Sequence, residues 1–127
     1  MLEKIVDEAK NTVVSAIEGA ADVINALRGS VKGVVVGTLK DAGEVTETTM
    51  SLVSGVVRGA MQGVAQAGKS TVEATTAIVS SAVQGVMDAG GDGASGAKNA
   101  VRGAVQGAAE MGGDVAAIAV AAVEGTL

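Results

Sequence analysis

The side chains of this chain that could take part in chemistry are hydroxyls, carboxylates, amines and guanidinium groups, because its 127 residues include no His, Cys or aromatic residue. The chain therefore lacks the usual general base, a thiol nucleophile and the ligands of soft metals. The segment from Asp88 to Gly93 is similar to a calcium loop, but it has neither the alternating ligands nor the terminal bidentate Glu. No phosphate-binding loop or nucleophile elbow occurs. We predict no catalytic, cofactor-binding or metal-binding residue, and we expect that the protein is not an enzyme.

The charge and the hydropathy of the chain limit which partners it could bind and in which cellular compartment we expect it. The net charge is −5 and the nine basic residues are scattered, which disfavours nucleic acid, because its binding needs a concentrated positive surface. The charged start, Met1 to Glu8, is not typical of a secretory signal. The longest strongly apolar run, Val115 to Val123, is too short to span a bilayer. We expect a cytoplasmic protein, with an extracellular filament as the alternative, and no small-molecule substrate.

An eleven-residue repeat organises the elements that carry these side chains. The segments Arg58–Gly63 and Arg102–Gly107 are nearly identical and lie 44 residues apart. When the chain is written in rows of eleven, five of the eleven columns hold only one charged residue, Arg28. Eleven residues in three turns is close to the helical period and slightly above it. The repeat predicts an all-α fold of long amphipathic helices or helical hairpins, packed through small residues, with a tendency to a right-handed supercoil.

The repeat runs through residues 1–127 without a shift, so we expect a single helical repeat domain. Proline is absent, and the predicted turns are therefore polar or glycine-rich stretches near residues 43–49 and 89–96. A weaker turn signal is Gly112-Gly113-Asp114, in which Asp114 could cap a helix. Because the frame continues across these stretches, the sequence leaves open a long continuous helix or hairpins whose turns keep the phase.

The composition predicts that the helices need partners along their length. Gly, Ala and Val make up about half of the chain, with 19 glycines. Each glycine costs a helix about 1 kcal/mol relative to alanine, whereas glycines at spacing four allow two helices to approach closely. The wide apolar face must be buried against neighbours or an apolar phase. We predict an assembly interface formed by Gly29, Gly33, Gly37, Gly55, Gly59, Gly63, Gly85, Gly103, Gly107, Val31, Val53, Val64 and Val86.

The charged stripe opposite the apolar face has a basic edge and an acidic remainder. Such a helix can pair edge to edge with a copy of itself, in a heterologous contact that propagates unless it closes into a ring. An ordinary solvated face is the alternative interpretation. The residues predicted to pair between helices are Lys32, Arg58, Lys69, Arg102, Asp88 and Glu110.

The repeat resembles known helical proteins, in period above all. Eleven-residue repeats of Gly, Ala, Val, Thr and charged residues are similar to those of synucleins and late-embryogenesis-abundant proteins, although their K-T-K-E-G-V motif is only approximated by Gly68–Glu73. The segment Arg102–Asp114 resembles the R-G-A-x-x-G-A-x-E-x-G-G-D units of Ala/Gly-rich bacterial proteins. No activity follows from the second resemblance.

These patterns favour a structural protein that self-assembles into a helical homo-oligomer such as a filament, tube or sheath. The chief alternative is an amphipathic, surface-active protein that coats lipid, membrane or storage-granule surfaces. A stress protectant similar to late-embryogenesis-abundant proteins, which folds on drying, is a third hypothesis. The expected partner is another copy of the chain or an apolar surface.

Overall fold

The computed structural model describes residues 2–127 and confirms the all-α prediction, since no strand occurs among these residues. Six helices of 11 to 20 residues pack as a bundle, together with one helix of a single turn. The helices are α1 (Leu2–Ile17), α2 (Val23–Ala42), α3 (Glu47–Met50), α4 (Leu52–Gln66), α5 (Thr71–Asp88), α6 (Gly93–Met111) and α7 (Val115–Gly125).

Each turn between the long helices combines a glycine in the left-handed region with a polar N-cap. At the α6–α7 turn, Gly112 has φ 69° and ends α6, a conformation that costs other L-residues roughly 1–2 kcal/mol. The carboxylate of Asp114 then accepts a hydrogen bond of 3.1 Å from the backbone N–H of Ala117. The remaining glycines of positive φ are Gly19, Gly43, Gly68 and Gly90. The chain therefore forms separate helices joined by tight turns and not one continuous helix.

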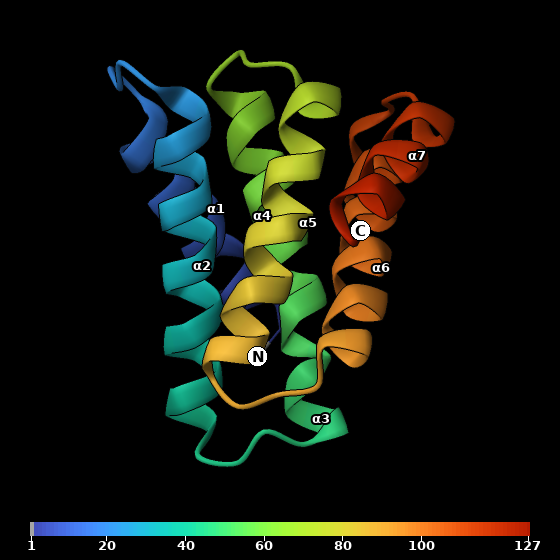
Figure 1. Ribbon diagram of the computed structural model, residues 1–127. Coiled ribbons are helices and arrows are strands. Elements are labelled where there is room, and N and C mark those ends of the chain that lie inside the picture. Colours follow the sequence, from blue (N-terminus) through green and yellow to red (C-terminus); the bar gives the residue numbers. More distant parts are fainter. Residues whose placement is uncertain (1) are drawn as a thin grey trace.

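The long helices form three antiparallel hairpins that lie side by side (Figure 1). We call α1–α2 hairpin I, α4–α5 hairpin II and α6–α7 hairpin III. The first helices contact one another in the order α1, α4, α6, and the second helices in the order α2, α5, α7. Hairpin II therefore separates the other two, and the stack has two outer faces.

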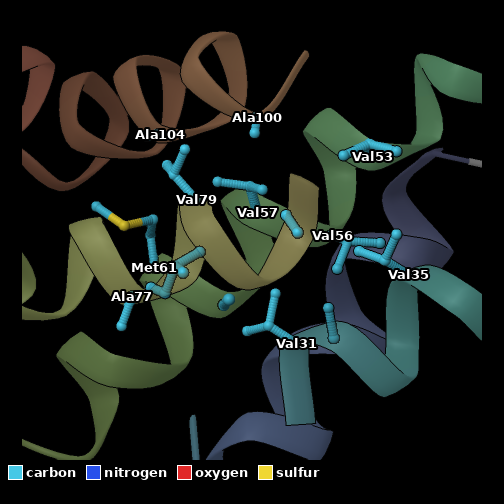
Figure 2. Packing of buried hydrophobic residues seen from close by; sticks show 14 of the residues in the cluster. Val31, Val35, Val53, Val56, Val57, Met61, Ala77, Val79, Ala100 and Ala104 are labelled. Carbon is cyan, nitrogen blue, oxygen red and sulfur yellow. The ribbon is translucent and has the colours of Figure 1, made fainter. Parts of the chain in front are cut away.

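The core between the hairpins consists of small aliphatic side chains. Figure 2 shows Val31 and Val35 of α2 close to Val56 of α4, and Val79 of α5 between α4 and α6. The largest fully buried side chains are only Ile, Leu and Met, among them Ile17, Leu27, Leu39, Met61, Ile78 and Ile118. Because no aromatic ring has to be accommodated, the helix backbones can lie close together.

Candidate assembly surfaces

Glycines of α4 form the contact between hairpins I and II. A Cβ atom at Gly59 would overlap the backbone carbonyl oxygen of Val6 in α1, and one at Gly63 would lie 2.9 Å from that of Lys10. At Gly55 it would lie 2.6 Å from the side chain of Leu2. Gly59 and Gly63 admit no larger residue unless the α1 backbone moves, whereas at Gly55 only the end of the Leu2 side chain would have to shift. The predicted close packing through Gly55, Gly59 and Gly63 thus occurs within one chain.

The second helices use the same device between hairpins I and II. Gly85 of α5 faces α2, where a Cβ atom would lie 3.0 Å from the Val35 side chain and 3.2 Å from the Lys32 carbonyl oxygen. The four predicted valines are buried in the core of the same chain, at 0 or 1% exposure: Val31, Val53, Val64 and Val86.

The contact between hairpins II and III repeats this arrangement. A Cβ atom at Gly103 of α6 would overlap the carbonyl oxygen of Ser54, and one at Gly107 would lie 3.2 Å from the side chain of Met61. At Gly125 of α7 a Cβ atom would lie 2.8 Å from the carbonyl oxygen of Thr76. The sequence prediction missed Gly125, although it shares the eleven-residue column of Gly59 and Gly103.

Two ion pairs join successive hairpins. Lys32 Nζ lies 2.9 Å from Asp88 Oδ2, which links α2 to α5. Arg58 Nε lies 3.2 Å from Glu110 Oε1, which links α4 to α6 through an ion-pair contact at an angle unsuited to a hydrogen bond. The other two residues of the predicted charge pairing, Lys69 and Arg102, are exposed and take part in no ion pair within residues 2–127.

The outer face of hairpin I carries the three predicted glycines that have no neighbour. Gly29, Gly33 and Gly37 are exposed, and a Cβ atom at any of them would meet nothing within 4 Å. We call these three residues the α2 glycine ridge. They line an open groove of about 550 Å³ between α1 and α2, whose apolar lining includes Ile5, Val34 and Leu52.

The outer face of hairpin III is apolar along α7. Val120 is 61% exposed, Val123 is 52% exposed and Leu127 is 97% exposed. We call these three residues the α7 apolar face. Both outer faces therefore leave small or apolar surface that no other helix of residues 2–127 covers.

The structure assigns helix-end roles to the segment that is similar to a calcium loop. Asp88 pairs with Lys32, and the Asp92 carboxylate accepts a hydrogen bond of 3.1 Å from the Ala94 N–H, which caps α6. Within residues 2–127 no three acidic side chains lie where they could hold a metal ion. No helix in this part of the chain has the length and apolarity that crossing a membrane requires.

A comparison of the chain with protein-family models and with curated proteins finds no match. The resemblance to eleven-residue repeat proteins therefore stays a prediction, and a function has to be inferred from the arrangement of the stacked hairpins.

Proposed function

We propose that this protein is a structural protein, not an enzyme, and that it assembles with copies of itself into a filament, tube or sheath. The observation that carries the proposal is the α7 apolar face at the outer side of hairpin III. In proteins built from stacked repeats, terminal repeats normally have a polar outer face that stops further stacking and keeps the protein soluble. Hairpin III has no such polar cap along α7, so this end of the stack is suited to receive another helix.

The helix composition supports the same proposal. Inside the chain, every glycine-rich helix contact joins one hairpin to the next, as at Gly59 against Val6 and at Gly103 against Ser54. A contact of this kind can be repeated between copies, because it needs only a small-residue ridge on one side and a helix backbone on the other. The eleven-residue period, slightly above the helical period, favours a gentle right-handed supercoil where helices wrap around each other. The cytoplasm is the expected compartment, and an extracellular filament is the alternative.

Sedimentation velocity over a range of protein concentrations, with negative-stain electron microscopy, tests this proposal. We expect species that grow with concentration and elongated particles of constant width. A folded monomer that keeps the same sedimentation coefficient up to high micromolar concentration would contradict the proposal.

A second candidate function is the coating of a lipid or storage-granule surface, and the same α7 apolar face favours it, since exposed apolar patches mark membrane sites as well as protein interfaces. The two candidates differ in flotation with phosphatidylcholine vesicles. Self-assembly predicts that the protein stays at the bottom of the gradient, whereas surface coating predicts that it floats with the lipid.

A further inference from the structure

The three hairpins correspond residue by residue, and this correspondence relates the two outer faces. The N-caps of the second helices are Asp22, Ser70 and Asp114, which lie 48 and then 44 residues apart. The contacts between hairpins follow the same offsets. Gly59 and Gly103 are 44 residues apart, and the carbonyl groups they meet, those of Val6 and Ser54, are 48 residues apart. An offset of 48 therefore relates hairpin I to hairpin II, and an offset of 44 relates hairpin II to hairpin III.

The α2 glycine ridge corresponds to a face that is covered in the other two hairpins. Its counterparts in α5 are Ala77, Ser81 and Gly85, all buried, and Gly85 packs on Val35 of hairpin I. In α7 the counterparts that fall within the helix are Ala121 and Gly125, which meet hairpin II. This face thus receives the preceding hairpin in hairpins II and III, whereas no hairpin among residues 2–127 covers it in hairpin I.

The α7 apolar face corresponds to the opposite side of the same contact. Val120 and Val123 are the counterparts of Thr76 and Val79, which pack against Gly125 of the next hairpin. In hairpin III these positions are exposed, because no further hairpin within residues 2–127 covers them. The α2 glycine ridge at one end of the molecule therefore lacks the kind of face that covers its counterparts in hairpins II and III. The α7 apolar face at the other end is a face of that kind without a ridge packed on it.

The charges at the two ends are also complementary. Arg58 and Glu110 form the ion pair between hairpins II and III. By the offsets above, Arg102 on hairpin III corresponds to Arg58, and Glu18 on hairpin I corresponds to Glu110. Both counterparts are exposed and opposite in sign. A contact between two copies that repeated the internal geometry would bring Arg102 of one copy to Glu18 of the next.

The second ion pair gives the same result with the signs exchanged. Lys32 and Asp88 join hairpins I and II. Their counterparts at a contact between copies are Glu124 on hairpin III and Lys40 on hairpin I, both exposed. Because both internal ion pairs have oppositely charged counterparts at the ends, two independent charge pairs favour the same partner, a second copy in the same orientation.

We propose that copies of the chain stack head to tail, with the α7 apolar face of one copy on the α2 glycine ridge of the next. The inference rests on the proposed function of self-assembly and specifies the joint. A contact between two different faces is heterologous and propagates into a filament unless it closes into a ring. Asn11 and Ser15 of α1 occupy the positions of Gly59 and Gly63, so α6 of one copy cannot approach α1 of the next as closely as α4 approaches α1 within the chain. The joint is therefore centred on α2 and α7, the helices that carry Lys40 and Glu124.

Complementation between two blocked variants tests the joint. Gly33→Glu blocks the ridge and Val120→Glu blocks the apolar face, and both positions are exposed, so the fold should survive, as circular dichroism would verify. Each variant alone should lose assembly, because every contact between two identical copies would include one blocked surface. An equimolar mixture should form a one-to-one dimer and stop there. Single variants that assemble like the natural chain, or that each form dimers alone, would overturn the head-to-tail joint.

A charge exchange provides the second test. Lys40→Glu should weaken self-association about fivefold, the size expected for one exposed ion pair, and the double variant with Glu124→Lys should restore it. Lys69→Glu in the turn of hairpin II is the matched control, because it changes the net charge equally and Lys69 does not line the groove at the α2 glycine ridge. If the natural chain never assembles, the proposed function fails. If it assembles and the exchange has no effect, self-assembly stands and this joint is wrong.

Discussion

Gly59 and Gly103 lie against backbone carbonyl groups of a neighbouring helix, whereas Gly33 and Gly37 face open space. All four belong to ridges of glycines spaced by four residues. The two pairs differ in whether close packing offsets the cost of glycine in a helix. At the covered positions the helix accepts a poor helix former and gains close packing with its neighbour. At the open positions the same cost, about 1 kcal/mol per glycine, has no compensation inside the isolated chain.

The largest expected effect is at a covered glycine. Gly103→Ala should lower the free energy of unfolding by about 2 kcal/mol, because its Cβ atom would press on the rigid Ser54 backbone and forced overpacking outweighs the gain in helix propensity. Urea denaturation followed by circular dichroism measures this difference. An unchanged midpoint would show that α6 can move away from α4 at little cost, and the close contact would then lose its importance.

A turn glycine should have the next largest effect. Gly112→Ala should lower the stability by about 1.5 kcal/mol, since alanine in the left-handed region is disfavoured by that order, although no neighbouring atom is within 4 Å. The matched control is Gly113→Ala, whose Cβ atom would meet only ordinary contacts at 3.7 Å. Thermal unfolding of both variants separates backbone conformation from packing. Equal stability of the two would contradict the assignment.

Replacing an open glycine by alanine should raise the stability instead of lowering it. Gly33→Ala should raise the stability of the dilute, unassembled chain by about 0.8 kcal/mol, the helix-propensity difference alone, because nothing lies near its Cβ position. Urea denaturation at low protein concentration provides the measurement. A loss of stability would mean that the ridge is covered within the chain, and the comparison of covered and open glycines would fail.

The smallest expected effect belongs to an ion pair. A double-mutant cycle of Arg58→Met and Glu110→Gln should give a coupling of about 0.5 kcal/mol, because the Glu110 side chain is half exposed and solvent weakens the attraction. The coupling should fall further in high salt. A coupling as large as the effect at Gly103 would show that charge, not glycine packing, determines the contact between hairpins II and III.

The eleven-residue period was sufficient to predict helices, and turns do occur at residues 43–46 and 89–92, within the ranges near 43–49 and 89–96. The turn around Gly19 was not predicted, because a single glycine in a glycine-rich chain does not distinguish a helix end from a packing position. The turn at Gly112 had the clearer signal of two glycines followed by a capping aspartate.

The division of the predicted interface into covered and open positions could not come from the sequence. Periodicity assigns Gly29, Gly33 and Gly37 to a small-residue ridge just as it does Gly55, Gly59 and Gly63. Their surroundings differ because α2 belongs to the first hairpin of a stack and α4 to the second. This is a property of the order of hairpins in space. The sequence likewise indicated which charged residues could pair between helices. That Lys32 pairs with Asp88 depends on the register between α2 and α5, which the sequence does not give.

The separation of hairpin I from hairpin III by hairpin II affects how the molecule opens. Because extensive contacts join only adjacent hairpins, one terminal hairpin can detach while the remaining pair keeps its own packing. Amide hydrogen exchange should therefore be graded, slowest in α4 and α5 and faster in α1, α2 and α7. In a head-to-tail stack the terminal hairpins would gain neighbours, and this gradient along the chain would become flatter.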